Sequence, residues 1–341
     1  MFSVQSLVRP NILQMEAYSS ARDEYQGPPA IFLDANESPF GTYNRYPDAR
    51  QTVLKSIWAE QNNIHPDQVF VGNGSDEIID LCYRVFCRPG IDVAYQFSPT
   101  YGMYAVLAQL NDVHLQDMPL DRSFRICSAA LPAFPAGTAK LLFVCSPNNP
   151  TGNDPGDIIP VIESFPGIVV VDEAYIDFSN QNTSVRLLQQ YPNLLVMRTL
   201  SKARGLAAAR IGIAMADETI ISLLNKVKPP YNISRLNQEA AIAALKNTAA
   251  SDAFTAIVIA ERERVRKALS ILTCILEVYP SDANFLLCRV KDPAGLYDYL
   301  VNRGIIVRNR DRQVPGCLRI SIGTPLENEQ LIQALNNYQI P

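Results

Sequence analysis

A lysine, two hydroxyl side chains and an arginine lie close together between residues 199 and 212. Thr199, Ser201 and Lys202 follow a short apolar run, residues 194–197, which predicts a buried strand. A lysine at a strand end among small residues can be desolvated, which lowers its pKa and makes the amine a nucleophile for Schiff-base chemistry. The two hydroxyls and the guanidinium of Arg210 could hold a phosphate beside that amine. The same stretch also fits a polar loop with a solvated lysine, so the rest of the chain must decide between the two.

A possible anion site follows another predicted strand. Gly74, Ser75 and Asp76 join residues 69–71 to a helix with apolar residues at helical spacing. A strand, a glycine-rich turn and a helix N-terminus direct free N–H groups and the positive end of a helix dipole toward an anion. Helix capping by Ser75 would also explain the pattern. The order Gly-Asn-Gly-Ser matches neither a dinucleotide fingerprint nor a P-loop, so it specifies no nucleotide.

Further side chains that could do chemistry also follow predicted strands: Asp172 and Tyr175 after residues 168–171, Asn149 after 141–145, and Tyr101 after 92–96. Taken singly, each has an ordinary structural explanation, as a turn residue or a core aromatic. Polar groups gathered at the carboxyl ends of parallel strands, however, mark the ligand-binding edge of an α/β sheet.

Alternating strands and helices predict that residues 31–235 form a large α/β domain with a mostly parallel sheet. Its seven predicted strands are 69–71, 92–96, 113–116, 141–145, 168–171, 194–197 and 211–215. Residues 1–30 are predicted as an N-terminal arm, and residues 31–47 as a short strand followed by a loop.

The pattern changes after Pro229-Pro230. Residues 254–278 carry apolar side chains at helical spacing and predict a long amphipathic helix able to bridge two domains. Shorter strands and helices are predicted at 284–290, 293–303, 305–309, 317–322 and 326–337. Residues 236–341 are therefore predicted as an interdomain helix and a small α+β C-terminal domain.

Composition argues against several classes of function. A formal charge of −4 gives no sign of a surface for nucleic acid or anionic membrane, and no run of about 18 apolar residues could span a bilayer. The seven cysteines are scattered without Cys-x-x-Cys pairs, which suits free thiols in a reducing cytoplasm. The only two histidines, His65 and His114, lie far apart, so no metal site and no Ser-His-Asp triad is expected.

Pyridoxal phosphate would use the groups at the strand ends all at once. It has an aldehyde for a lysine, a phosphate for an arginine and a helix N-terminus, a phenolate oxygen for hydrogen-bond donors, a pyridine nitrogen for a carboxylate, and flat faces for an aromatic ring. The matching residues, in that order, are Lys202; Arg210 with Gly74, Ser75 and Asp76; Asn149 and Tyr175; Asp172; and Tyr101. Chance is a poor explanation when every part of one cofactor site is present.

Nine stretches, in order along nearly the whole chain, make the sequence resemble the fold-type-I pyridoxal-phosphate aminotransferases. They are YSSAR (18–22), LDANE (33–37), NRYP (44–47), GSDE (74–77), PTYGMY (99–104), SPNNPTG (146–152), VDEAY (171–175), RTLSK (198–202) and GCLRISIG (316–323). The lysine, NPTG and DEAY stretches are shared across the superfamily. The YSSAR, NRYP and PTYGMY stretches are most similar to the histidinol-phosphate aminotransferases.

The resemblance implies a role for each matching residue at the cofactor. Lys202 would carry the cofactor and shuttle a proton, and Asp172 would pair with the ring nitrogen. Asn149 and Tyr175 would bond the phenolate oxygen, and Tyr101 would stack on the ring. The implied phosphate ligands are Gly74, Ser75, Asp76, Thr199, Ser201 and Arg210, together with Tyr46 from the partner subunit of a homodimer.

The resemblance also implies the reaction: imidazole acetol phosphate and glutamate would give histidinol phosphate and 2-oxoglutarate, in histidine biosynthesis. Arg319 would bind the carboxylate of glutamate or the phosphate of histidinol phosphate, with Arg308 and Tyr18 assisting at the phosphate. The stretch after the lysine departs from the family pattern Lys-Ala-Phe-Gly-Leu-Ala-Gly-Leu-Arg. Arg204 replaces the aromatic residue, Ala208 a glycine and Ala209 a leucine, while the spacing from lysine to arginine is kept.

Other functions stay open at this point. A threonine-phosphate decarboxylase of cobalamin synthesis would have a similar sequence but would release CO₂ and need no glutamate. An aromatic amino-acid aminotransferase is a third reading, against which Arg308 argues mildly because one carboxylate needs fewer cations. A pyridoxal-phosphate-binding transcription regulator would need a helix-turn-helix domain for which residues 1–30 are too short, and a dinucleotide dehydrogenase would need a Gly-x-Gly-x-x-Gly turn.

Overall fold

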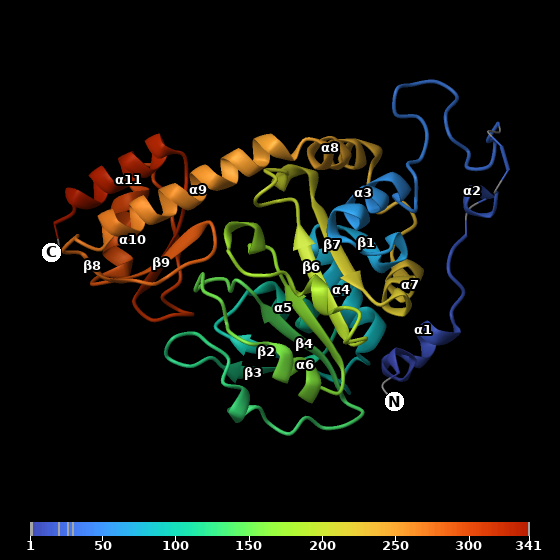
Figure 1. The fold of residues 1–341 in the computed structure, drawn as a ribbon, viewed down its shortest axis with the longest axis horizontal. Helices are drawn as coiled ribbons and strands as arrows, with labels where there is room; N and C mark the ends of the chain where they lie inside the picture. The colour runs from blue at the N-terminus through green and yellow to red at the C-terminus, as the bar shows by residue number, and fades with distance from the viewer. Residues whose placement is uncertain (1–2, 20, 26, 29–30, 340–341) are drawn as a thin grey trace.

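The computed structural model describes residues 3–19, 21–25, 27–28 and 31–339. The remaining residues of the predicted arm lie outside the described part of the chain, as do 340–341. The large domain, the small domain and the helix that joins them follow one another along the longest axis of the molecule, and the arm runs along the outside of the large domain (Figure 1). The predicted α/β fold class is confirmed. The domain boundaries after residues 30 and 235 stay predictions.

A seven-stranded sheet forms the large domain, in the order β1-β7-β6-β5-β4-β2-β3. Its strands are β1 (Val69–Asn73), β2 (Val93–Ser98), β3 (His114–Pro119), β4 (Ala139–Cys145), β5 (Ile168–Asp172), β6 (Leu194–Thr199) and β7 (Ile211–Ala216). Among these seven strands β7 alone runs in the direction opposite to the other six, so the sheet is mostly parallel, as predicted.

Helices cover both faces of this sheet. They are α3 (Thr52–Asn62), α4 (Ser75–Phe86), α5 (Met103–Leu110), α6 (Ile159–Ser164), α7 (Glu218–Val227) and α8 (Arg235–Lys246). Along β4, Leu141 and Phe143 pack into the core under α4, α5 and α7, whereas Leu142 and Val144 pack into the core under α3, α6 and α8. Because successive side chains of a strand point to opposite faces, burial on both sides requires the continuous apolar runs seen in the sequence.

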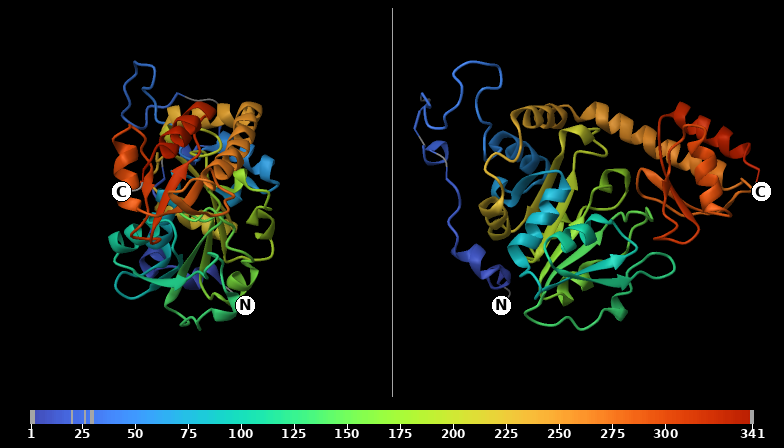
Figure 2. Two further views of the ribbon diagram at one scale, coloured as in Figure 1. Left: turned by 90° about the vertical axis from the view of Figure 1, so that its left-hand side faces the viewer. Right: turned by 180° about the vertical axis from the view of Figure 1, so that it is seen from behind.

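The small domain is a four-stranded antiparallel sheet, in the order β10-β11-β9-β8, packed against helices. Its elements are β8 (Ile275–Val278), β9 (Phe285–Val290), α10 (Pro293–Val301), β10 (Arg308–Asn309), β11 (Cys317–Ser321) and α11 (Pro325–Asn336). Helix α9 (Thr248–Leu269) reaches this domain from the large one, as the right-hand view of Figure 2 shows from behind.

The predicted helix at 254–278 is wrong at both ends. Helix α9 begins at Thr248 and ends at Leu269, and residues 275–278 form strand β8 instead. Ile275 pairs with Val290 of β9, and Val278 pairs with Cys288. A short apolar run fits a helix or a strand equally well by spacing, and here pairing with a distant strand decides.

Where the structure describes it, the N-terminal segment forms three short helices: η1 (Val4–Leu7), α1 (Pro10–Gln14) and α2 (Ala21–Glu24). The strand predicted at the start of residues 31–47 is absent, because Ile31 and Leu33 are almost fully exposed and pair with no strand among the described residues. Further short 3₁₀ helices are η2 (Pro66–Gln68), η3 (Ser128–Ala130), η4 (Ile176–Phe178), η5 (Ser184–Leu187) and η6 (Ala207–Ala209).

Within the described ranges, no single helix is both long enough and apolar enough to cross a membrane. Helices α8 and α9 would meet the length and composition requirement only as a pair, and they are bent by 77° relative to each other.

Candidate active site

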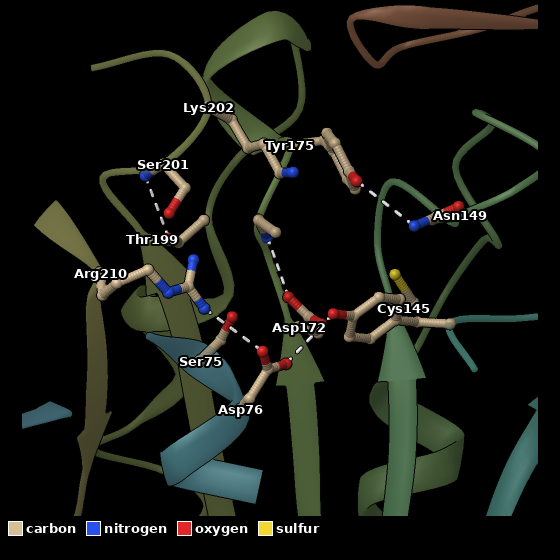
Figure 3. A pocket seen from close by; sticks show the side chains of 12 residues that line it. Ser75, Asp76, Cys145, Asn149, Asp172, Tyr175, Thr199, Ser201, Lys202 and Arg210 are labelled. Carbon is tan, nitrogen blue, oxygen red and sulfur yellow. Dashed lines mark hydrogen bonds and ion pairs between the residues drawn. The ribbon is translucent and has the colours of Figure 1, made fainter. Parts of the chain in front are cut away.

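Most of the residues that the sequence predicts to bind the cofactor meet in one pocket at the carboxyl ends of β4, β5 and β6 (Figure 3). The residues that line it are Ser75, Asp76, Tyr101, Cys145, Asn149, Asp172, Ala174, Tyr175, Thr199, Ser201, Lys202 and Arg210. All the predicted cofactor residues are among them except Gly74 and Tyr46. Five separate segments of the chain supply these side chains, because parallel strands end at the same edge of the sheet.

One side of the pocket is the N-terminus of helix α4. Gly74 precedes the helix with φ of 78°, in the left-handed region that favours glycine. A Cβ atom at Gly74 would lie 2.5 Å from Nη2 of Arg210, so only glycine lets the guanidinium rest against this turn. Nη2 of Arg210 lies 3.3 Å from Oδ2 of Asp76. The amide N–H of Gly74 donates to the main-chain carbonyl oxygen of Arg210 over 2.7 Å. The turn, the helix N-terminus and the guanidinium therefore form one anion-binding corner.

Two hydroxyls border the same corner. The hydroxyl of Thr199 donates to the carbonyl oxygen of Ile211 over 3.0 Å and accepts the amide N–H of Ser201 over 3.1 Å. These bonds hold the turn after β6 in place, so the hydroxyl of Ser201 lies on the pocket wall beside Arg210 (Figure 3).

Asp172, the last residue of β5, lies at the bottom of the pocket and is almost fully buried. Its Oδ2 accepts the hydroxyl of Tyr104 over 2.7 Å, and its Oδ1 accepts the amide N–H of Ala174 over 3.1 Å. Burial raises the pKa of this carboxyl to about 6, and the two hydrogen bonds limit the rise. The carboxylate is thus fixed in orientation and costly to ionise without a cationic partner.

The buried carboxyl should make the cofactor-free protein less stable as the pH rises. The folded protein holds this proton more tightly than the unfolded chain, so the free energy of unfolding falls between about pH 4 and pH 6. Above pH 6 the ionised carboxyl lowers the free energy of unfolding by about 3 kcal/mol. Asp172→Asn, which carries no charge, should therefore unfold at a higher urea concentration than wild type at pH 8. A stability difference between the two proteins that did not shrink toward pH 4 would contradict this account.

A chain of polar contacts crosses the opposite side of the pocket. Nδ2 of Asn149 lies 3.3 Å from the hydroxyl of Tyr175, and Oδ1 of Asn149 accepts a hydrogen bond from Nη1 of Arg319. The guanidinium of Arg319 also lies over the ring of Phe285, 5.1 Å from its centroid. Asn149 therefore links the large domain to Arg319 of β11 in the small domain, and the pocket lies where the two domains meet.

Lys202 lies at the rim of the pocket, with Nζ 5.6 Å from the centroid of the Tyr175 ring. Part of its side chain is accessible to solvent. The protein atoms around the amine nevertheless displace much of its water and so lower its pKa, and the positive charge of Arg319 lowers this pKa further. Figure 3 shows the amine directed into the pocket, above Asp172. A lysine in this state is a better nucleophile than a solvated one.

Tyr101 closes another wall of the pocket. Its hydroxyl donates to Oδ1 of Asp76 over 3.1 Å, and its ring meets the ring of Tyr104 edge to face at 5.6 Å. The ring is therefore held in place from two directions.

Some predicted residues lie outside this pocket. Tyr46 stacks on Tyr231, with ring centroids 4.4 Å apart, and lines a separate pocket. Tyr18 is exposed and lines a separate cavity near α3 and α7. Arg308 is exposed and lies directly opposite Arg319 in the β10–β11 pair. The structure of one chain therefore does not bring Tyr46 or Tyr18 to the pocket.

Sequence reasoning missed Cys145 and Ala174, which line the pocket between predicted residues, and Arg310. Burial, and then the charges of Arg319 and Arg308, lower the pKa of Arg310 to about 10. The Nε atoms of Arg310 and Arg319 are both buried without a hydrogen-bond partner. In an extended segment, residues two positions apart point to the same side. Because Arg310 lies two residues after the predicted Arg308, this spacing could have identified it in the sequence.

The substitutions after Lys202 have a local explanation at one position. Nη1 of Arg204 donates to Oγ of Ser251 over 2.7 Å and to Oδ1 of Asp252 over 2.8 Å, at the start of α9. The ion pair between Arg204 and Asp252 thus connects the segment after Lys202 to helix α9, at the position where the family pattern has an aromatic residue. Ala208 and Ala209 belong to the short helix η6, which leads into Arg210.

The donor set of the pocket fits pyridoxal phosphate. The corner formed around Gly74 matches a phosphate, the fixed carboxylate of Asp172 matches a ring nitrogen, and the Asn149–Tyr175 pair matches a phenolate oxygen. Among the described residues no group of three or more His, Cys, Asp or Glu side chains could hold a metal ion.

Comparison with known proteins agrees with this fit. The family model for aminotransferase class I and II matches residues 15–335. The chain is 47% identical to a histidinol-phosphate aminotransferase of Cytophaga hutchinsonii, with 99% of each chain covered. It is 46% identical to a histidinol-phosphate aminotransferase of Parabacteroides distasonis over the whole of both chains.

A solved structure has the same fold. The histidinol-phosphate aminotransferase of Sinorhizobium meliloti in complex with pyridoxal-5'-phosphate superposes with a TM-score of 0.78, at 24% identity and with 89% of each chain covered. The chain therefore belongs to the aminotransferase class I and II family of pyridoxal-phosphate enzymes, in the branch of the histidinol-phosphate aminotransferases.

Proposed function

We propose that this enzyme transfers an amino group from glutamate to imidazole acetol phosphate, forming histidinol phosphate and 2-oxoglutarate in histidine biosynthesis. The observation that carries the proposal is the similarity, over 99% of the chain, to relatives named as histidinol-phosphate aminotransferases. Three features of the site support it: the anion-binding corner around Gly74, the amine of Lys202, and three arginines of the small domain that are described below.

We propose that the chain's own residues divide the work on the cofactor as follows. When bound, pyridoxal phosphate supplies an aldehyde for the amino group and a ring that accepts the electron pair released when the substrate loses its α proton. The phosphate is held by Gly74, Ser75, Asp76, Thr199, Ser201 and Arg210. Asp172 keeps a proton on the ring nitrogen, Asn149 and Tyr175 bind the phenolate oxygen, and Tyr101 covers one face of the ring. Nζ of Lys202 holds the cofactor and then takes up the α proton.

Arg308, Arg310 and Arg319 supply the charge for an anionic substrate. None of the three forms an ion pair with a described carboxylate, although burial and mutual repulsion lower the pKa of Arg310 and Arg319. Clustered cations without a counter-ion favour binding of an anion, and a phosphate carries more charge than a single carboxylate. Arg319, nearest to Asn149, serves both substrates, and Arg308 and Arg310 serve chiefly the phosphate. Tyr18, which one chain does not bring to the pocket, stays a predicted contact of this phosphate.

Arg310→Gln should lower kcat/KM for histidinol phosphate by about 10- to 100-fold, because a hydrogen bond between charged groups contributes about 1.5–3 kcal/mol. The effect on glutamate should be smaller, since glutamate lacks the phosphate. Arg312→Gln is the matched control: the same charge is lost two residues further on, at an exposed position. Steady-state kinetics with both substrates measure the effect, and equal losses for the two substrates would assign Arg310 a structural role.

A half-reaction assay tests the proposed function itself. Absorbance of the bound cofactor is followed after mixing with histidinol phosphate, glutamate, threonine phosphate or phenylalanine. Histidinol phosphate and glutamate should both convert the cofactor to its amine form. Release of CO₂ from threonine phosphate would instead identify a decarboxylase, and a fast reaction with phenylalanine alone would identify an aromatic aminotransferase.

The active unit that we propose is a homodimer in which Tyr46 reaches the cofactor phosphate of the partner subunit. The loop that carries Tyr46 projects from the large domain between α2 and α3 (Figure 1) and exposes Ile31, Leu33 and Phe40 to 90%, 87% and 85%. Glu37 nevertheless holds this loop in place, since it accepts hydrogen bonds from Arg45 and from the amide N of Tyr46. An ordered loop with exposed large apolar side chains is typical of a protein interface.

Phe40→Asp should therefore convert the dimer into a monomer, because a charge at an apolar interface is left desolvated and unpaired. Light scattering at several protein concentrations measures the mass. Ile271→Asp is the control, since Ile271 is 84% exposed on the small domain, away from this loop. A wild-type protein that is fully active as a monomer would refute the proposal.

We further propose that the enzyme works in the cytoplasm. All seven cysteines are free thiols and six of them are buried, which suits a reducing compartment.

A further inference from the structure

Tyr104 is a buried residue to which neither the sequence nor the proposed mechanism has assigned a role. It belongs to helix α5 and is 0% exposed, directly beneath the pocket. Its hydroxyl lies 2.7 Å from Oδ2 of Asp172. Burial and the nearby carboxylate raise the pKa of this phenol well above its ordinary value, so the phenol keeps its proton and donates it to Asp172.

Tyr104 cannot turn away from Asp172 without disturbing the core. Its ring stacks on Phe143 of β4, with centroids 4.7 Å apart and planes 12° apart, and meets Tyr101 edge to face. The hydroxyl of Tyr83 in α4 donates to the carbonyl oxygen of Tyr104 over 3.0 Å. Two helices and a strand thus fix the position of one hydroxyl.

This hydroxyl and the amide N–H of Ala174 each occupy one oxygen of Asp172, which fixes the plane of the carboxylate. The hydrogen bond from Tyr104 also does most to offset the cost of burying the charge. The other titratable groups that face Asp172 are Asp76 from α4, Tyr101 before α5, Cys145 from β4, Tyr175 after β5 and Lys202 after β6. Among these groups Lys202 is the one cation, so the hydroxyl is the main local support for the ionised carboxylate.

We propose that Tyr104 is a positioning residue for this enzyme: its hydroxyl aims Asp172 at the cofactor's ring nitrogen and keeps the carboxylate ionised there. The inference rests on the proposed role of Asp172 and extends it by one residue. Without the hydroxyl the carboxylate becomes more basic, so the proton between the two groups lies more on Asp172 and less on the ring nitrogen. The cofactor is then held less tightly and accepts electrons less well.

Tyr104→Phe removes one oxygen atom and keeps the stacked ring. For the holoenzyme we expect the dissociation constant of pyridoxal phosphate, measured by equilibrium dialysis, to rise roughly tenfold, as for loss of one hydrogen bond to a charged group. The limiting rate of the half-reaction with glutamate should fall about 10- to 100-fold, while the glutamate concentration for half-saturation changes by less than about twofold.

Tyr279→Phe is the matched control, because Tyr279 is also buried and also loses one hydroxyl hydrogen bond, which it accepts from Arg289, yet it packs in the small domain against Leu287 and Cys317. Both variants should lose a similar amount of thermal stability, but only Tyr104→Phe should change cofactor affinity and the limiting rate. Equal changes of cofactor affinity in the two variants would overturn the proposal, since they would show a general effect of core packing.

The double variant Asp172→Asn/Tyr104→Phe tests whether Tyr104 acts through Asp172. When Asp172→Asn is already present, the loss of the hydroxyl should change cofactor affinity by less than about twofold. A further tenfold loss there would overturn the proposal, because the hydroxyl would then act independently of the carboxylate. If Asp172→Asn alone left affinity and rate unchanged, the proposed role of Asp172 would fail together with this one. A normal Asp172 effect with an inert Tyr104→Phe would sink the Tyr104 proposal alone.

Discussion

Lys202→Ala should reduce amino transfer by about 10⁴-fold, the upper end of the range expected when a group that transfers the proton is removed. The same substitution removes the amine that holds the cofactor covalently, so pyridoxal phosphate should bind only through noncovalent contacts. Both effects have one physical origin. Burial and the charge of Arg319 lower the pKa of Lys202, so the amine is available both as a nucleophile and as a base.

Borohydride treatment followed by peptide mapping measures the attachment. Wild-type protein should carry the reduced cofactor on the peptide that contains Lys202, and the alanine variant should carry none. Lys55→Ala is the matched control, because burial lowers the pKa of Lys55 to about 8 while this lysine lines a separate cavity. Label on Lys55 or another lysine would show that the wrong amine had been assigned.

Asp172→Asn should slow transamination by about 10³-fold, since removing one preorganised group at the reacting centre of an enzyme costs about 10²- to 10³-fold in rate. An amide cannot hold the proton of the ring nitrogen, so the ring loses its capacity to accept the electron pair. The fold should persist, because the amide oxygen can accept from Ala174 while the amide nitrogen donates to the oxygen of Tyr104. Stopped-flow half-reactions with glutamate measure the rate.

Glu173→Gln is the control for this substitution. Glu173 is the next residue and its carboxyl is equally buried, but it bonds to Thr183 and to the amide N–H of Ser184, each over 2.6 Å, away from the pocket. Burial raises the pKa of both carboxyls, so a general penalty for buried charge would affect the two variants alike. Asp172→Asn within about threefold of wild type would show that Asp172 does not pair with the ring nitrogen.

Much of the fold and of the cofactor pocket could be predicted because both depend on local patterns. Strands buried on both faces need continuous apolar runs, so β4, β5 and β6 were recognisable in the sequence. Parallel strands end at one edge, so residues that follow them, such as Asp172 and Lys202, had to lie close together. The extent of α9 was predicted wrongly, because residues 275–278 gain their structure from pairing with β9, which lies further along the chain.

The sequence by itself determined the large α/β domain with a mostly parallel sheet, the residue types of the cofactor pocket and the resemblance to one enzyme family. Only the tertiary structure decided which side chains touch within that frame. The hydrogen bond from Tyr104 joins residues that are 68 positions apart, and the link from Arg319 to Asn149 spans 170 positions and two domains. Such contacts depend on how helices and domains pack and on which way each side chain points, and neither is written in the periodicity of a short segment.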